Sequence, residues 1–198
     1  MDWGRIAKRI RVPLGFLFAA FFLWRAQPQW WSLAVGSLVA LAGVLVRAIS
    51  SGHVKKNEEL ATTGPYAYTR NPLYFGSIVI ASGFALAALR WEIALALVIM
   101  FAAIYIPVIR GEEEFLSTHF AGYSEYCAQV PRLLPRLSPR LSPGVSLGVS
   151  PSSQPNQPGQ PGPRFSRELY LKHREYNALL GTLAVIIALV AKRIWMAR

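Results

Sequence analysis

Long uninterrupted blocks of apolar residues constrain this chain more than any other feature. They cover residues 12–24, 30–49, 72–89 and 91–109. Most of them approach the ~20 residues that a helix needs to cross the hydrocarbon core of a bilayer. Hydrophobic residues make up 53% of the sequence, and its mean hydropathy is +0.32. The sequence therefore predicts an all-α integral membrane protein, because a soluble domain would interleave polar residues with these blocks.

Two apolar segments have an alternative interpretation. The basic amino terminus and the first block together have the pattern of a signal peptide, but no small-x-small cleavage site follows Trp24, and Pro28 leads directly into the second block. These features favour a retained first span. A last apolar stretch, residues 178–191, has a length between that of a span and that of an interfacial helix. We therefore expect a bundle of about four to five transmembrane helices.

The distribution of Lys and Arg predicts the orientation of the bundle. These residues concentrate in the amino terminus, in the loop of residues 50–71 and after the fourth block, whereas the opposite loops hold Arg25 and Arg90. The first three regions should therefore face the cytoplasm; basic residues flank both ends of the last stretch and leave its orientation open. The net charge of +11 fits an anionic membrane surface, because most aromatic residues lie in or beside the apolar blocks. We expect membrane lipid as a partner and no nucleic acid.

The segments after the fourth block differ in composition. Residues 112–130 carry aromatic side chains at helical spacing between polar residues, which predicts an amphipathic helix at the cytoplasmic face, broken or kinked at Gly122. Residues 136–163 are rich in Pro, Ser, Gly and Gln and cannot bury a core, so we predict a flexible linker. The expected organisation is a membrane core of residues 1–135, this linker, and a C-terminal helix within residues 164–198.

Two polar clusters interrupt the apolar pattern. Residues 64–76, ahead of the third block, hold three tyrosines and Arg70, and residues 112–114 after the fourth block are glutamates. The third and fourth blocks join at Arg90, so they should form a tight hairpin whose outer ends lie on the same side of the bilayer. The clusters should therefore meet. Arg70 and Arg110 can pair with the glutamates or hold an anionic ligand, and the tyrosine rings can surround a flat or cationic ligand.

Other chemistries find little support. The sequence has no Gly-rich nucleotide motif, no zinc-ligand spacing and no serine–histidine pattern. The single cysteine, Cys127, excludes an internal disulfide and a cysteine metal cluster, and we predict that it packs, because no activating base is near in sequence. We predict no metal site. His119 and His173 are interpreted as surface residues, and Arg70, taken alone, can equally be a positive-inside anchor.

Several motifs in order identify a family. The chain contains Gly52-His53-x-x-x-Asn57, then Leu60-Ala61-Thr62-Thr63-Gly64-Pro65-Tyr66, then Arg70-Asn71-Pro72-x-Tyr74-x-Gly76. It continues with Glu112-Glu113, Phe120-x-Gly122-Tyr123-x-x-Tyr126 and Val130-Pro131-Arg132-x-x-Pro135. In this order and spacing, over about residues 47–135, the chain resembles the isoprenylcysteine carboxyl methyltransferase family and its phospholipid-methyltransferase relatives.

This resemblance implies an integral membrane enzyme that uses S-adenosylmethionine, with its active site facing the cytoplasm and open to lipid. It implies that the cofactor-binding residues are His53, Asn57, Gly64, Tyr66, Asn71, Pro72, Tyr74, Gly76, Glu112 and Glu113. Arg70 and Arg132 are the expected catalytic residues, because either guanidinium can hold a carboxylate on substrate or cofactor. Asn71 stands where the family has a histidine. An asparagine can take over hydrogen bonding at this position, but it cannot replace a titrating imidazole.

The reaction that the resemblance favours is carboxyl O-methylation of a lipophilic or lipid-modified acceptor, of the isoprenylcysteine type. An ionised carboxylate is already a nucleophile, so the enzyme needs to align it and exclude water rather than supply a strong base. Two alternatives stay open. One is N-methylation of a phospholipid or another lipid amine, and the other is a non-catalytic membrane adaptor that retains the fold.

Overall fold

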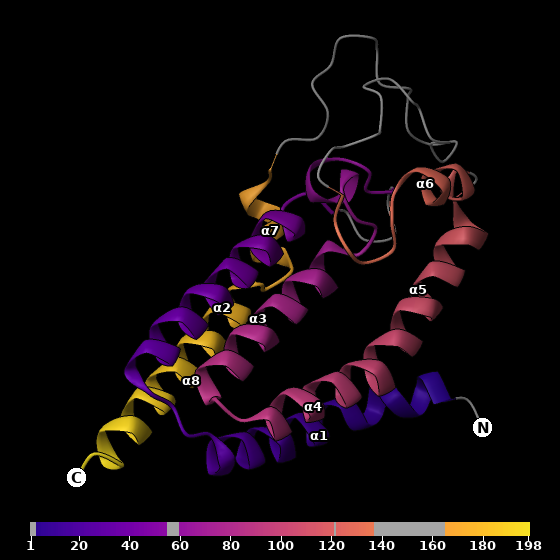
Figure 1. The fold of residues 1–198 in the computed structure, drawn as a ribbon. Helices are drawn as coiled ribbons and strands as arrows, with labels where there is room; N and C mark the ends of the chain where they lie inside the picture. The colour runs from indigo at the N-terminus through magenta and orange to yellow at the C-terminus, as the bar shows by residue number, and fades with distance from the viewer. Residues whose placement is uncertain (1–2, 55–59, 121, 137–164) are drawn as a thin grey trace. The chain divides into compact units, whose positions relative to one another are not determined.

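The computed structural model describes residues 3–54, 60–120, 122–136 and 165–198, with the backbone alone for residues 3–12. Within these ranges all regular structure is helical and no strand occurs, which confirms the predicted all-α class. Figure 1 labels the helices along the chain. They are α1 (Trp3–Arg25), α2 (Trp30–Ser51), the short 3₁₀ helix η1 (Gly64–Ala67), α3 (Pro72–Ala88), α4 (Trp91–Met100), the π-helical turn η2 (Phe101–Tyr105), α5 (Ile106–His119), α6 (Tyr123–Gln129), α7 (Arg167–Lys172) and α8 (Tyr176–Trp195).

Three helical stretches of the described chain are long and apolar enough to cross a membrane: Trp30–Ser51, Trp91–His119 and Tyr176–Trp195. Two shorter apolar helices, Pro13–Arg25 and Pro72–Ala88, correspond to the first and third blocks. The predicted four to five spans are therefore present as three full-length helices and two shorter ones. The last block, ambiguous in sequence, forms a helix of 20 residues.

The fourth block continues further than the sequence pattern indicated. Its helix runs without interruption from Trp91 to His119, so the first half of the predicted amphipathic helix is its continuation. Three successive glutamates are good helix formers, and they carry the helix beyond the apolar residues. The predicted break near Gly122 is present, because α6 begins directly after that residue. The distortion expected at Pro107 lies in the turn before it, the π-helical η2; proline cannot donate to the carbonyl four residues earlier, and a wider turn accommodates this.

The chain divides into two compact units. Unit 1 comprises Met1–Val44, Ser77–Gly111 and Asn177–Arg198. Its buried cluster draws residues from α1, α2, α3, α4 and α8: Phe22, Ala26, Leu33, Ala87, Ala88, Ile93 and Leu189. Helices α2 and α3 cross closely, because a Cβ added to Gly36 would lie 2.5 Å from the Gly83 carbonyl oxygen. Small residues permit such backbone contact between membrane helices.

Contacts in unit 1 show which helix ends lie together. The Ser32 hydroxyl donates to the Ala87 carbonyl (3.1 Å), so the start of α2 lies beside the end of α3. Lys192 Nζ donates to the Trp24 carbonyl (2.9 Å), so the end of α8 lies beside the end of α1. The Arg193 guanidinium lies 5.9 Å from the centre of the Trp30 ring, so the ends of α3 and α8 both lie near the start of α2.

Unit 2 comprises Leu45–Gly76 and Glu112–Tyr176 and contains all the motifs named above. Its buried cluster consists of four residues from α6 and its flanks: Phe120, Tyr123, Tyr126 and Val130. The Tyr126 hydroxyl donates to the Tyr66 carbonyl (2.7 Å) and ties α6 to η1. Except for Arg136, the predicted linker lies outside the described residues. After it, residues 165–176 belong to unit 2, whereas α8 belongs to unit 1.

Candidate functional site

The turn ahead of α3 has a backbone that its sequence dictates. Gly64 has a φ of +59°, a left-handed conformation that residues with a side chain rarely adopt. A Cβ at this position would also lie 2.6 Å from the His53 ring. Pro65 lies at the start of η1, and Pro72 begins α3, where its missing N–H is no loss. The turn is therefore preset by two prolines and one glycine.

A second segment, residues 130–136, lies along this turn. The Arg70 amide donates to the Pro131 carbonyl (2.9 Å), and the Arg136 amide donates to the Tyr68 carbonyl (3.1 Å). The Asn71 side chain donates through Nδ2 to the Arg132 carbonyl (2.8 Å). Asn71 therefore joins two motifs through a neutral hydrogen bond, a role that needs no titrating group.

A carboxylate between two arginines forms the centre of the site. Glu113 has a side-chain exposure of 12%, and its Oε1 lies 3.3 Å from Arg70 Nη1. Arg132 approaches the same carboxylate with two nitrogens, Nε at 3.1 Å from Oε1 and Nη2 at 2.9 Å from Oε2. Such a fork fixes the orientation of both groups. Arg70 is 14% exposed and Arg132 is 56% exposed, so the two guanidinium groups differ in their access to solvent.

The electrostatic setting keeps Arg70 cationic. Burial by itself lowers the pKa of this guanidinium, but the neighbouring Cys127 and Glu113 outweigh that effect and raise the pKa above its ordinary value. Arg70 Nη1 also donates to Cys127 Sγ (2.6 Å). Cys127 packs against the buried cluster of unit 2, as predicted, and it is also a polar neighbour of Arg70. Cys127 lies one helical turn after Tyr123, and this spacing could have predicted that the two side chains share one face of the helix.

The two predicted polar clusters meet through Tyr74. Its hydroxyl, in the first turn of α3, donates to Glu112 Oε1 in α5 (2.8 Å). Glu112 is exposed, whereas Glu113, the next residue, is largely covered. The structure thus brings Tyr74, Glu112, Glu113, Arg70 and Arg132 together in unit 2.

The remaining predicted site residues lie at the border of this cluster. His53 faces Gly64, and its Nδ1 makes a hydrogen bond to the Ile49 carbonyl (2.8 Å). Tyr66 is buried; burial first, and the charge of Glu112 second, raise the pKa of its hydroxyl above the ordinary range. Pro72 and Gly76 are also buried. Asn57 lies outside the described residues. Cofactor binding by all these residues stays a prediction.

Three buried polar atoms of unit 2 have no hydrogen-bond partner among the described residues: Thr63 Oγ1, Arg70 Nε and the Tyr123 hydroxyl. Folded proteins satisfy nearly all buried polar groups, so such atoms call for an explanation. The pKa of Tyr123 is raised, first by burial and then by the neighbouring Cys127 and the charge of Glu113. Thr63 and Tyr123 stand within the motifs but were not among the predicted site residues, because a motif does not reveal which of its hydroxyl groups lacks a partner.

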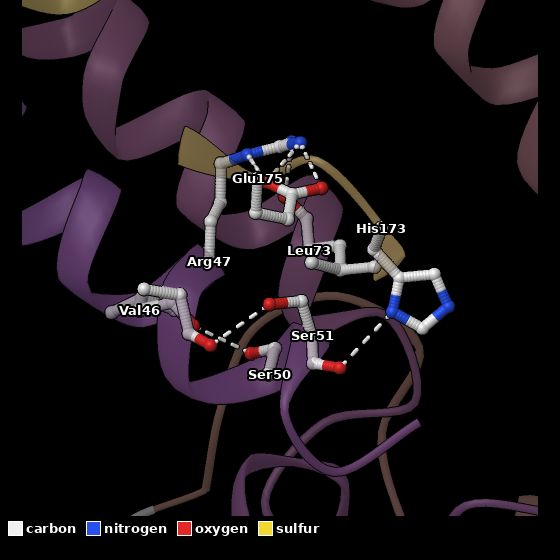
Figure 2. A network of polar contacts seen from close by, with 8 residues as sticks. Val46, Arg47, Ser50, Ser51, Leu73, His173 and Glu175 are labelled. Atoms are coloured by element: carbon white, nitrogen blue, oxygen red, sulfur yellow. Dashed lines mark hydrogen bonds and ion pairs between the residues drawn. The ribbon is translucent and has the colours of Figure 1, made fainter. Parts of the chain in front are cut away.

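A network joins the end of α2 to the segment that follows the linker (Figure 2). Arg47 donates to both oxygens of Glu175, with Nη2 at 2.9 Å from each, and its Nη1 donates to the Leu73 carbonyl (3.3 Å). His173 Nδ1 lies 3.3 Å from the Ser51 carbonyl oxygen. His173, predicted to lie at the surface, is partly exposed, and its ring also contacts the end of α2; residues so far apart in sequence gave no signal of this contact.

Parts of the chain are similar in sequence to known proteins. Residues 48–122 match the family model described as phospholipid methyltransferase. The nickel-cobalt-cadmium resistance protein NccN of Alcaligenes xylosoxydans is 36% identical over 77 residues, which is 39% of this chain and 36% of that protein. The cobalt-zinc-cadmium resistance protein CzcN of Cupriavidus metallidurans is 36% identical over 130 residues, which is 61% of this chain and 59% of that protein. The chain thus covers well under two thirds of either relative.

No solved structure matches the chain. The matched region contains the Gly52–Gly76 motifs and both glutamates, and it ends at Gly122, before Arg132. The family match supports a membrane methyltransferase and confirms the resemblance drawn from the motifs. Residues 48–122 are therefore similar to the phospholipid methyltransferases, a family within the group of membrane methyltransferases that includes the isoprenylcysteine carboxyl methyltransferases.

Proposed function

We propose that this protein is an integral membrane methyltransferase that uses S-adenosylmethionine and methylates a lipophilic acceptor at the cytoplasmic face. The observation that carries the proposal is the meeting of the two motif clusters: Tyr74 on Glu112, and Arg70 with Arg132 on Glu113. We further propose that residues 1–135 form the enzyme core, with residues 47–135 providing the site.

The residues present fit the chemistry of S-adenosylmethionine. The molecule carries an ammonium group, a sulfonium, a carboxylate and ribose hydroxyls. Exposed Glu112 can accept from the ammonium or the ribose, and the ring of Tyr74 can face the positive sulfur. Unpartnered Thr63 Oγ1 and Arg70 Nε supply further hydrogen-bonding groups nearby in the chain. When bound, S-adenosylmethionine supplies a methyl group on a positively charged sulfur, which passes to the acceptor and leaves S-adenosylhomocysteine.

The proposed acceptor is a carboxylate on a lipid-modified molecule. More than half of the Arg132 side chain is exposed, so its guanidinium retains accessible donors while Glu113 holds it in place. An ionised carboxylate acceptor needs orientation and the exclusion of water, and no base has to remove a proton. In this proposal Arg132 orients the acceptor and Glu113 orients Arg132.

A second acceptor, a phospholipid amine, is favoured by the family match itself. Such an amine is protonated at neutral pH and must lose a proton before it attacks. Glu112 would receive that proton, because it is the exposed carboxylate of the cluster and Tyr74 fixes its orientation. The two acceptors therefore give Glu112 different roles.

The test is incubation of membranes that contain the protein with a radiolabelled methyl donor. A base-labile labelled ester in the lipid phase supports the carboxylate acceptor, and a base-stable labelled headgroup supports the amine. Glu112→Gln should weaken binding of S-adenosylhomocysteine at least about tenfold, since a hydrogen bond to a charged group contributes about 1.5–3 kcal/mol. The matched control is Glu114→Gln, an exposed neighbour with the same change in charge. Failure of the wild-type protein to bind S-adenosylhomocysteine in lipid would favour the adaptor instead.

The names of the two relatives suggest a cellular readout. Both are called resistance proteins for cobalt and cadmium, together with nickel or zinc. We propose that methylation by this protein contributes to metal tolerance. Cells that carry Glu113→Gln in place of the wild type should then grow less well with added cobalt, whereas cells that carry Glu114→Gln should grow normally. Equal growth of the two variants would remove metal tolerance from the proposal.

A further inference from the structure

Residues 165–176 lie far outside the matched region, yet they contact the start of the motif region in unit 2. The Ser166 amide donates to the Gly52 carbonyl (2.9 Å), and the Phe165 ring lies 6.3 Å from the ring of His53. The Ser166 side chain accepts from the Leu169 amide (3.3 Å) and caps α7. This segment, which we call the strap, is therefore seated on the Gly52–His53 turn at its first residues.

The other end of the strap is held by an ion pair. Glu175 and Arg47 have side-chain exposures of 12% and 23%. The guanidinium grips both carboxylate oxygens, as Figure 2 shows, and one of its nitrogens remains directed at the Leu73 carbonyl. A bidentate pair of this kind restricts the arginine to one orientation. Glu175 therefore decides where Arg47 points.

The Leu73 carbonyl belongs to the first turn of α3, next to Tyr74. Tyr74 in turn donates to Glu112, and Asn71 donates to the Arg132 carbonyl. A continuous series of contacts thus runs from Glu175 through Arg47 to the turn that carries the proposed cofactor residues. Each step is a hydrogen bond between described residues of unit 2.

We propose that Glu175 is a positioning residue of the methyltransferase site. Through Arg47 it holds the first turn of α3 in the orientation that the methyl donor needs. A site that is already ordered loses less entropy when its ligand binds, so loss of this constraint should appear as weaker donor binding. This inference rests on the proposed function, and it assigns a role to a segment outside the family match.

The test compares single variants of the full-length protein in lipid. Glu175→Gln should raise the Kd of S-adenosylhomocysteine and the KM of the donor about tenfold, with a smaller change in kcat. Arg47→Lys keeps the charge but loses the two-pronged grip, and it should have a similar effect. Glu168→Gln, on the exposed side of the same strap, is the matched control and should bind like the wild type.

A charge swap separates positioning from simple stabilisation. Arg47→Glu combined with Glu175→Arg restores an ion pair but removes the donor to the Leu73 carbonyl. The inference expects the swap to recover thermal stability relative to Glu175→Gln while donor binding stays weak. Recovery of both thermal stability and donor binding would overturn the inference, because a stable ion pair would then suffice without the hydrogen bond to the Leu73 carbonyl.

If the swapped protein does not fold, the single variants still test the inference. Wild-type Kd and KM in Glu175→Gln, with or without a lower melting temperature, would overturn the inference and leave the proposed function intact. If the wild type itself does not bind S-adenosylhomocysteine, the proposed function fails and this inference fails with it. The two failures are therefore distinguishable by the wild-type measurement.

Discussion

Replacement of Tyr126 by Phe removes one hydroxyl and leaves the ring in place. That hydroxyl is buried and donates to the Tyr66 carbonyl at 2.7 Å, joining α6 to η1. The substitution leaves the carbonyl without this donor in a place that water does not reach. An unsatisfied buried acceptor costs about 1–3 kcal/mol, so Tyr126→Phe should lower the free energy of unfolding by that amount at neutral pH.

The dependence of the unfolding free energy on pH gives a second test of the buried tyrosines. Burial is the largest cause that raises the pKa of Tyr66, Tyr123 and Tyr126 in the folded protein, while unfolded tyrosine titrates near pH 10. Above about pH 10 the unfolded state releases protons that the folded state retains, so stability falls as the pH rises. Each such tyrosine lowers the free energy of unfolding by about 1.4 kcal/mol per pH unit in this range, and three together lower it by about 4 kcal/mol per pH unit. Tyr126→Phe should reduce this slope to about 3 kcal/mol per unit.

The assay is reversible unfolding in mixed micelles, followed by circular dichroism at pH values from neutral to strongly alkaline. The comparison needs the wild type and Tyr126→Phe under identical detergent conditions. Tyr176→Phe is the control, because that residue is exposed at the start of α8. Neutral-pH stability equal to the wild type, together with an unchanged alkaline slope, would refute the reasoning about buried phenols in unit 2.

Three further predictions concern other contacts. Gly83→Ala should lower the unfolding free energy by about 1–3 kcal/mol, because its Cβ would lie 2.5 Å from backbone atoms of α2; Gly181→Ala, in open space, should not, and equal melting temperatures would contradict the close crossing. Arg132→Gln should lower the free energy of unfolding by at most about 1 kcal/mol, because that guanidinium is exposed, and Arg70→Gln should lower it more, because Arg70 is largely buried. Denaturant titration that gives the reverse order would contradict this dependence on burial. An Ala197→Cys label should react from the side of the membrane opposite to a Thr62→Cys label, because α8 ends near the start of the candidate span α2 and Thr62 follows the end of that span; reaction of both with one impermeant reagent from the same side would contradict this.

Much of the fold could be predicted because apolar blocks act locally. A bilayer-length run of apolar residues must satisfy its backbone within a helix, whatever its neighbours are. The starts of α2, α3 and α4 therefore fall at or next to the predicted positions, at Trp30, Pro72 and Trp91. The end of α5 was missed because helix propensity, and not hydrophobicity, carries it through the glutamates to His119.

The site was predictable as a meeting of clusters but not as a set of partners. A short connection at Arg90 was enough to expect Tyr74 near the glutamates. The choice of Arg132 and Arg70 as the partners of Glu113 depends on how residues 130–136 lie along the turn, and side chains many positions apart leave no periodic signal. The same reason explains why the contacts of Cys127 with Arg70 and of His173 with Ser51 were not predicted.

The sequence alone thus determined the helical class, the resemblance to membrane methyltransferases and the two clusters, since each depends on short-range patterns or on motif order. Only the tertiary structure decided that Glu175 pairs with Arg47 across 128 positions and that the end of α8 contacts the end of α1. Such contacts join segments on either side of a linker. Their geometry comes from packing, because a linker sets the maximum distance between two segments but not which side chains meet.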